Sequence, residues 1–223
     1  DGRILRAGNT GDITASKVID ASGLVLAPGF IDVHGHIEGS IFERPTSDNY
    51  IFDGVTTVIT GNCGGSADDL KDFFRRIDSA RTSINVASLV GHNTVRRLAM
   101  GLEDRKAGKE EQARMESLVE KAMRDGAVGL STGLIYLPGM YGNTAEVEGL
   151  ARAAARYHGV YASHIRNEEN NVVQAIDEAI SIGKAASIPV QISHFKVSGK
   201  ANWGRSKETL HMIEDARKQG IDV

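Results

Sequence analysis

The sequence has 223 residues, of which 41% are hydrophobic and 25% charged, with a formal net charge of -3. This composition predicts a globular protein with a sizeable core and excludes a basic surface for nucleic acid, and no apolar run reaches the roughly 18 residues of a membrane span. Cys63 is the only cysteine, which excludes an intrachain disulfide. Because no secretory signal pattern opens the chain either, we expect the cytoplasm.

The first segment, residues 1–26, has a different sequence pattern from the rest of the chain. Turn signals at Asp1-Gly2 and again from Asn9 to Asp12 separate short apolar stretches, a pattern typical of short strands joined by turns. We therefore expect residues 1–26 to be the remnant of a small β-rich domain, cut from a longer N-terminus. Residues 27–223 are expected to form a second domain.

From Pro28 onward, short apolar stretches alternate with amphipathic stretches, which predicts strands alternating with helices. The expected strands are residues 30–36, 56–63, 84–92, 127–134, 160–166 and 190–196. A further apolar stretch at 221–223 predicts the beginning of a seventh strand.

The helices between these strands carry start signals of their own. Ser66 followed by Asp69 predicts the capping box of one helix, and Asn143 followed by Glu146 predicts the cap of another that ends at Gly159. Ser206 is expected to start the last helix. Apolar stripes at helical spacing support two more helices, at 111–124 and from 172 to the proline at 189.

Regular alternation of strand and helix implies a parallel sheet, either a (β/α)₈ barrel or an open doubly wound sheet. Polar residues at or near the ends of the strands favour the barrel, in which all carboxyl ends converge on one mouth. The first strand is also not followed by the glycine fingerprint of a dinucleotide-binding turn. We therefore predict the (β/α)₈ barrel.

Candidate metal ligands lie at several of these strand ends. His34 and His36 flank Gly35, and on a strand both would point to the same side because side chains alternate. Cys63, His164 and His194 come at the ends of three further strands. Imidazole and thiolate are ligands that Zn²⁺ prefers, and a catalytic site needs only about three of them. Five candidates predict two metal positions, or one occupied and one weak.

Two other residues near strand ends have more ordinary interpretations. His92 lies in Gly91-His92-Asn93, which fits the end of a strand and the cap of a helix, and we leave it out of the metal site. Arg166 lies two residues after His164 and could pair with a carboxylate, for which Glu168 and Glu169 are both available.

Several motifs together resemble the D-aminoacylase (N-acyl-D-amino-acid deacylase) branch of the amidohydrolase superfamily, in consistent order over the whole chain. They are residues 27–36, 60–64, 129–134, 162–166 and 191–196. In that branch a cysteine replaces the bridging carboxylated lysine of other amidohydrolases, and the resemblance gives this role to Cys63. It implies a tighter zinc held by Cys63, His164 and His194, and a weaker second position completed by His34 and His36.

The resemblance also implies an activity. The expected reaction is zinc-dependent hydrolysis of the amide bond of an N-acyl-D-amino acid, a small-molecule substrate, to a carboxylate and a free D-amino acid. Tyr136 and Lys196 would hold the substrate carboxylate. No nucleic acid or membrane partner is expected, and neither the oligomeric state nor the preferred side chain follows from the sequence.

The chain departs from the family pattern at the catalyst itself. The family's general acid/base is an aspartate at the end of the eighth strand, whereas this chain stops as the seventh strand begins. Asp222 lies inside that incoming strand rather than at its end, so no residue is assigned as the proton shuttle. We therefore expect a barrel truncated before its last strands.

Two other functions stay open. One is a cyclic-amide hydrolase of the dihydroorotase or hydantoinase kind, although such enzymes resemble this chain less because they use a lysine where Cys63 stands. The other is a metal-binding fragment without turnover, for which the absence of the eighth-strand aspartate is the supporting feature.

Overall fold

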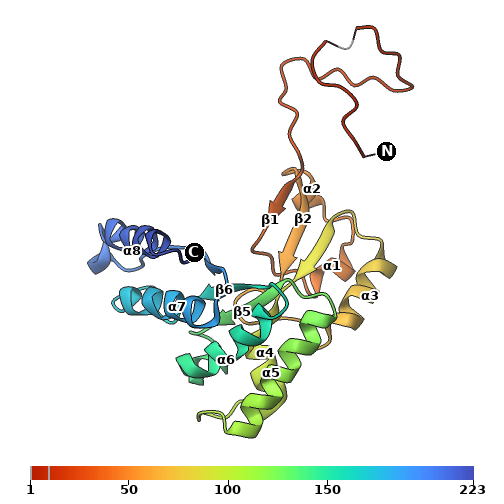
Figure 1. Cartoon of the computed structure of the whole chain (residues 1–223). Coiled ribbons are helices and arrows are strands. Elements are labelled where there is room, and N and C mark those ends of the chain that lie inside the picture. The colour runs from red at the N-terminus through yellow and green to blue at the C-terminus, as the bar shows by residue number, and fades with distance from the viewer. Residues whose placement is uncertain (1, 10) are drawn as a thin grey trace.

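The computed structural model describes residues 2–9 and 11–223. Its framework is a set of short strands that alternate with helices, except that the fourth strand follows the third directly (Figure 1). The strands are β1 (Phe30–Asp32), β2 (Val55–Thr60), β3 (Asn85–Ser88), β4 (Val90–Gly91), β5 (Gly129–Gly133), β6 (Val160–His164) and β7 (Val190–Ile192).

All strand pairs are parallel and follow chain order, β1-β2-β3 in one sheet and β4-β5-β6-β7 in the other. Only Leu89 separates β3 from β4, and its N–H donates to the Thr60 carbonyl across 2.9 Å. The Val128 N–H donates to the Ser88 carbonyl across 2.9 Å, which joins the two sheets. Since a doubly wound sheet reverses its order at a switch point, the described strands do not have that arrangement.

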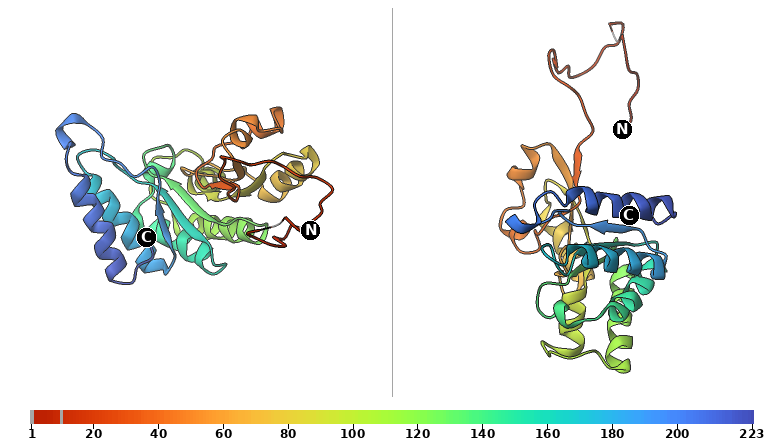
Figure 2. Two further views of the ribbon diagram at one scale, coloured as in Figure 1. Left: turned by 90° about the horizontal axis from the view of Figure 1, so that it is seen from above. Right: turned by 90° about the vertical axis from the view of Figure 1, so that its left-hand side faces the viewer.

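The helices lie outside the strands, and consecutive long helices pack against one another (Figures 1 and 2). The α-helices are α1 (Ser40–Glu43), α2 (Asp48–Ile51), α3 (Leu70–Ala80), α4 (His92–Met100), α5 (Lys109–Arg124), α6 (Thr144–Ala155), α7 (Val172–Ala186) and α8 (Ser206–Lys218). Two 3₁₀ turns, η1 (Gly139–Tyr141) and η2 (Lys200–Asn202), lie in the loops.

A large part of the core lies between β4–β7 and the inner faces of α5, α6 and α7, and the same cluster continues over β2 and α3. Leu130 of β5, Leu150 of α6 and Ile176 of α7 are fully buried there. On α7 the buried residues Val172, Ile176 and Ala179 recur at spacings of three and four, so one face of the helix meets the sheet. This packing fixes the ends of β5, β6 and β7, where most candidate ligands lie.

The predicted helix starts are confirmed in part. Asn143 caps α6, with its Oδ1 accepting from the Glu146 N–H across 2.9 Å, and α8 begins at Ser206. The cap predicted at Ser66 is wrong, because Asp69 caps α3 and accepts from the Asp72 N–H. Helix α6 ends at Ala155, earlier than Gly159, since Gly159 belongs to the turn that leads into β6.

The strands are shorter at their carboxyl ends than the sequence predicts. Strand β1 stops at Asp32, whose carboxylate accepts from the His34 N–H across 2.9 Å and turns the chain. The prediction that His34 and His36 share a strand face is therefore wrong, and both lie in the loop after β1. Lys196 likewise follows β7 in a loop and not on the strand.

The amino-terminal segment is exposed and extends away from the sheets (Figure 1). Within residues 2–9 and 11–29 the structure has no strand, so the short strands predicted there are not present. The turn at Gly11 has its N–H bonded to Asn9 Oδ1 across 3.0 Å. The turn predicted at Asp1-Gly2 includes Asp1, which lies outside the described residues.

The last residues, 221–223, form no assigned strand, but they lie beside β7. The Val190 N–H donates to the Asp222 carbonyl across 2.8 Å, the bond expected where the parallel strand predicted at 221–223 enters beside β7. No helix in the described part of the chain is long and apolar enough to cross a membrane.

Candidate metal centre

The sulfur of Cys63 lies at the centre of three imidazoles. Its Sγ is 3.5 Å from His34 Nε2, 3.6 Å from His164 Nδ1 and 3.8 Å from His194 Nε2. The four side chains come from the carboxyl ends of four strands: the loops after β1, β2 and β7, and the last residue of β6. Residues up to 160 positions apart thus meet at one edge of the parallel sheets.

These distances fit a tetrahedral metal ion. With metal–sulfur and metal–nitrogen bonds of about 2.3 and 2.0–2.1 Å, a tetrahedron separates a sulfur from a nitrogen ligand by about 3.6 Å. The three distances from Cys63 Sγ are close to that edge length. Among the described residues, His34, Cys63 and His194 form one group whose ligand atoms all lie within 4.8 Å of one another.

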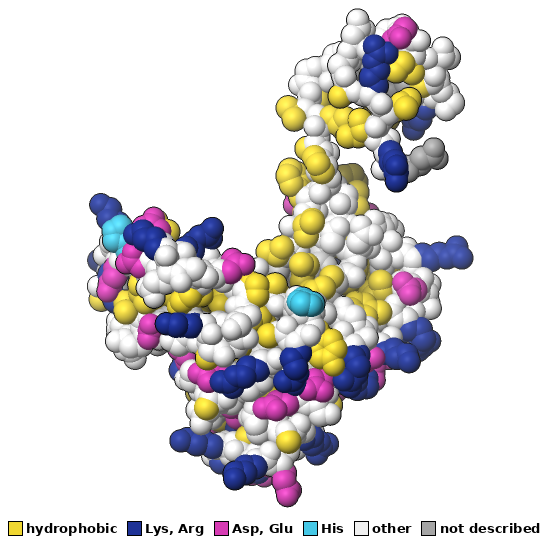
Figure 3. Space-filling view, viewed as in Figure 1, with side chains coloured by type: hydrophobic (Ala, Val, Ile, Leu, Met, Phe, Trp, Pro, Cys, Tyr) yellow, Lys and Arg dark blue, Asp and Glu magenta, His cyan; other side chains and the backbone are white. Residues whose placement is uncertain are grey.

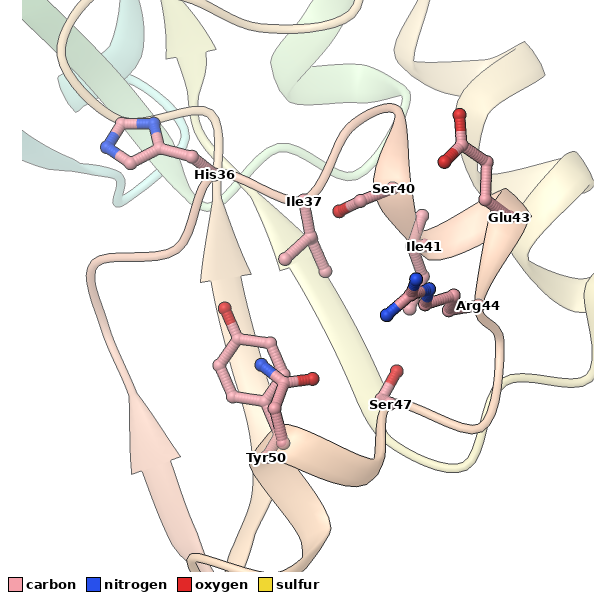
Figure 4. A pocket seen from close by; sticks show the side chains of 9 residues that line it. His36, Ile37, Ser40, Ile41, Glu43, Arg44, Ser47 and Tyr50 are labelled. Atoms are coloured by element: carbon pink, nitrogen blue, oxygen red, sulfur yellow. The ribbon is translucent and has the colours of Figure 1, made fainter.

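His36 lies beside this cluster rather than inside it. Its ring is 5.1 Å from that of His34, centroid to centroid, and its side chain is exposed. His36 also lines a cavity of about 500 Å³ between the β1 loop and helices α1 and α2 (Figure 4). In the described structure, neither of the groups with ligand atoms within 4.8 Å of one another includes His36.

Tight packing of glycines holds the loop that carries Cys63. Cys63 itself has a left-handed backbone with φ of 53°, and so does Gly64 with φ of 79°. A Cβ on Gly133 would lie 2.1 Å from the Cys63 carbonyl oxygen, so only glycine allows β5 to approach so closely. The Ser131 hydroxyl completes the contact by accepting from the Gly64 N–H across 3.1 Å.

Asn62 ties the Cys63 loop to the loop of His34. Its amide nitrogen donates to the Val33 carbonyl across 3.3 Å and to the Ile59 carbonyl across 3.0 Å. The Gly35 N–H donates to the Ile59 carbonyl as well, across 2.8 Å. The His34 imidazole is therefore positioned by the end of β2, the same element that positions Cys63.

The electrostatics of the cluster suit imidazole ligands. Burial lowers the pKa of His164 to about 4 and also lowers the pKa of His34, so both rings are neutral at pH 7 and carry a free lone pair. Burial, together with the nearby Glu168 carboxylate, raises the pKa of the Cys63 thiol. A metal ion bound here would have to displace that proton, since the thiolate is the ligand.

The two predicted substrate-binding residues flank the cluster. The Tyr136 ring lies edge-on to His164 with 4.8 Å between the centroids, and 46% of its surface is exposed. The Lys196 ammonium is exposed and lies 3.2 Å from His194 Nδ1. Both exposed side chains therefore lie next to histidines of the metal cluster.

Sequence reasoning missed the role of Glu168 in this site. Its Oε1 is 2.6 Å from Lys196 Nζ, 3.0 Å from His194 Nδ1 and 3.7 Å from His164 Nε2. The available signal was its position four residues after His164, in the loop that follows β6. A carboxylate there was considered only as a partner for Arg166.

Arg166 has a different partner from those predicted. It binds Glu178 of α7 in a bidentate pair, with Nε–Oε2 and Nη2–Oε1 distances of 2.9 Å each, and not Glu168 or Glu169. Its guanidinium also donates to the carbonyls of Met140 and Gly142. Arg166 therefore anchors the loop after β5, which carries Tyr136, to helix α7.

His92 is absent from the metal cluster, as its sequence context predicts. It is fully buried at the start of α4, and its Nε2 lies 2.8 Å from Glu146 Oε1. The other Glu146 oxygen accepts from Arg96 across 2.6 Å. This buried group joins α4 to α6.

The arrangement of thiolate and imidazole ligands at the ends of parallel strands has relatives of known structure. Residues 17–218 match the sequence pattern of the amidohydrolase family. The chain belongs to the amidohydrolase family. Its α/β fold with parallel sheets matches that of solved D-aminoacylases, which confirms the coarse fold class predicted from sequence.

Three members of this amidohydrolase family illustrate the similarity. The D-aminoacylase of Alcaligenes xylosoxydans xylosoxydans is 38% identical over 96% of this chain and 49% of its own length. The structure of N-acyl-D-glutamate deacylase from Bordetella bronchiseptica, complexed with zinc and a phosphonate inhibitor, has a TM-score of 0.94 and 40% identity over 100% of this chain and 52% of that one. A D-aminoacylase structure described with a binuclear metal centre has a TM-score of 0.93, with 36% identity over 97% and 50% of the two chains.

The chain thus spans about half the length of the curated relatives that it matches.

Proposed function

We propose that this amidohydrolase is a zinc-dependent deacylase that hydrolyses the amide bond of N-acyl-D-amino acids to a carboxylate and a free D-amino acid. The observation that carries the proposal is the position of Cys63 Sγ, 3.5–3.8 Å from nitrogens of three histidines. The proposal concerns the complete protein, by which we mean this chain with any sequence that flanks it in its gene.

In this proposal Cys63, His164 and His194 hold the tighter zinc, while His34 and His36 complete a weaker position next to Cys63. The donor set fits, since thiolate and neutral imidazole are zinc ligands and His164 presents Nδ1 to Cys63 Sγ at 3.6 Å. Two similar structures are described with zinc or with a binuclear metal centre. Zinc, when bound, polarises an amide carbonyl and lowers the pKa of water towards about 7.

The residues of the chain itself would bind and orient the substrate. Lys196 and Tyr136 lie next to histidines of the cluster and would hold the α-carboxylate, one through an ion pair and the other through its hydroxyl. The Lys196 ammonium is already fixed by Glu168 across 2.6 Å. Because an ammonium has three donors, it keeps two of them for a substrate carboxylate.

We also infer that the complete domain is a (β/α)₈ barrel, of which residues 27–223 supply the first strands. Parallel strands in uninterrupted chain order and the bond from Val190 to Asp222 support this inference. Exposed apolar side chains along β1, such as Phe30 and Ile31, give the closing strands a surface to cover (Figure 3). Residues 1–26 as the remnant of a second domain, the cytoplasm as compartment and an eighth-strand aspartate as proton shuttle all stay predictions.

The test is an assay of the complete, zinc-loaded protein with N-acetyl-D-methionine, N-acetyl-D-glutamate, their L-enantiomers and dihydroorotate. We expect release of the free D-amino acid and little from the L-forms. Hydrolysis of dihydroorotate alone would identify a cyclic-amide hydrolase instead. Zinc binding without turnover of any of these substrates would favour the non-catalytic interpretation and refute the deacylase.

A further inference from the structure

We propose that Glu168 is a positioning residue that sets the tautomers of His164 and His194, so that the nitrogen of each ring that faces Cys63 carries a free lone pair. This inference rests on the zinc site proposed above. It assigns a role to a carboxylate that is only 16% exposed and that lies against three basic side chains.

The geometry places Cys63 and Glu168 on opposite edges of both imidazoles. His194 directs Nε2 to Cys63 Sγ at 3.8 Å and Nδ1 to Glu168 Oε1 at 3.0 Å. His164 has the reverse orientation, with Nδ1 at 3.6 Å from the sulfur and Nε2 at 3.7 Å from the carboxylate. One carboxylate oxygen therefore lies behind both rings.

This arrangement decides which nitrogen carries the proton. A neutral imidazole has one N–H donor and one acceptor nitrogen, and a carboxylate can only accept. The nitrogen facing Glu168 must then be the donor, which leaves the nitrogen facing Cys63 as the acceptor. A carboxylate or carbonyl behind a metal-bound histidine has the same effect in metal sites generally, where it fixes the ring and raises its basicity.

His164 gives an independent sign of this role. Its Nε2 is buried and has no hydrogen-bond partner in the described structure. Glu168 Oε1, at 3.7 Å, is the carboxylate towards which it points, and a shift of less than about 1 Å would form a normal hydrogen bond. A small movement of the Glu168 side chain towards His164 would therefore complete the bond.

Lys196 offers the competing arrangement. Its ammonium lies 3.2 Å from His194 Nδ1 and could donate to it only if the ring proton were on Nε2, between the ring and Cys63. That tautomer would remove the lone pair that a metal needs. The shorter contacts, 3.0 Å from Nδ1 to Glu168 and 2.6 Å from Lys196 to Glu168, favour a carboxylate that accepts from both.

Glu168 is less suited to be a metal ligand itself. Glu168, His164 and His194 could form a second group of ligand atoms within 4.8 Å of one another. An ion there would lie next to the Lys196 ammonium, which already occupies Oε1. It would also use the two nitrogens that point away from Cys63, and so would leave the only thiol out of the site.

The test compares Glu168→Ala and Glu168→Gln with the matched variant Glu169→Gln, which removes the same charge from the exposed neighbouring residue. Zinc affinity of the complete protein is measured by competition with a chelator, and the tautomers of the metal-free protein by ¹⁵N NMR of the histidine rings. Melting temperatures of the metal-free variants show whether each one folds.

We expect Glu168→Ala to lower zinc affinity about 10–100-fold and to move the His194 proton away from Nδ1, with Glu169→Gln unchanged in both. Glu168→Gln keeps one acceptor oxygen and should restore part of the affinity. Equal affinity and equal tautomers in Glu168→Ala and Glu169→Gln would overturn the inference while the zinc site stands. If the wild-type protein bound no zinc, or bound it as tightly after Cys63→Ala, the proposed site and this inference would both be refuted.

Discussion

Cys63 Sγ lies 3.6 Å from His164 Nδ1, although 101 residues separate them in the chain. The contact depends on parallel strands whose carboxyl ends share one edge, because Cys63 follows β2 and His164 ends β6. A site assembled in this way should lose function through changes in its ligands and through changes in the backbone that supports them.

Replacing a ligand should remove the metal without unfolding the chain. We expect Cys63→Ala and His194→Ala to lower the zinc content of the purified protein, measured by elemental analysis. His211→Ala is the matched control, since His211 is an exposed histidine of α8 whose ion-pair partner is Glu214. Zinc content equal to that of the wild type in both ligand variants would refute the proposed site.

The close approach of β5 to the Cys63 loop gives a backbone prediction. Gly133→Ala places a Cβ 2.1 Å from the Cys63 carbonyl oxygen, so the loop must move and zinc content should fall. Gly39→Ala is the control, because the space around Gly39 is open and its φ is negative. Equal zinc content in the two alanine variants would show that the loop adapts without cost.

How far the sequence predicts the site can be judged from particular residues. The clustering of Cys63, His164 and His194 could be predicted because each lies at or just after the end of a strand, and parallel strands bring such positions together. The loop positions of His34 and His36 could not be predicted, because the Asp32 carboxylate accepts from the His34 N–H and β1 ends early. Such a local bond competes with the sheet and leaves little trace in hydrophobic patterning.

Pairs of side chains from different elements are harder still to predict from the sequence. Arg166, which lies just after β6, pairs with Glu178 of α7, and nothing in the sequence ranks Glu178 above the nearer Glu168 and Glu169. The role of Glu168 likewise depends on the distance between two rings from different strands. The alternation of strands and helices, in contrast, follows directly from apolar periodicity and was predicted well.

Lys196 should act in substrate binding. We expect Lys196→Ala to raise KM for an N-acyl-D-amino acid about ten- to a hundredfold, with zinc content retained, because a charge-assisted hydrogen bond to the carboxylate is lost. Steady-state kinetics of the complete protein measure this, and Lys200→Ala, an exposed lysine of η2, serves as control. A KM equal to that of the control would make Lys196 an ordinary surface residue.

The buried group of α4 and α6 should matter for stability and not for zinc. Arg96→Met leaves the Glu146 carboxylate buried beside His92 without its 2.6 Å partner, and we expect a loss of about 3–5 kcal/mol in the free energy of unfolding. Urea denaturation of the metal-free protein measures the loss. Arg152→Met, which breaks the exposed pair with Glu148, should cost about 0–1 kcal/mol.

The same group gives a pH dependence. Burial alone would raise the pKa of Glu146, but the bonds from His92 and Arg96 outweigh it and hold the pKa below the ordinary value of 4.5. The stabilisation is therefore complete above about pH 4.5 and is lost as the pH falls through the lower pKa of the folded state. Unfolding free energies measured across this range should fall less steeply in Glu146→Gln, and an identical slope would contradict the assignment.

The most direct measurement of the metal centre is anomalous diffraction at the zinc edge from crystals of the complete, zinc-loaded protein. We predict a peak about 2.3 Å from Cys63 Sγ and about 2.0–2.1 Å from His164 Nδ1 and His194 Nε2. A structure without anomalous density beside Cys63, or with the ion bound by Glu168 on the far side of the two rings, would contradict the proposed zinc site.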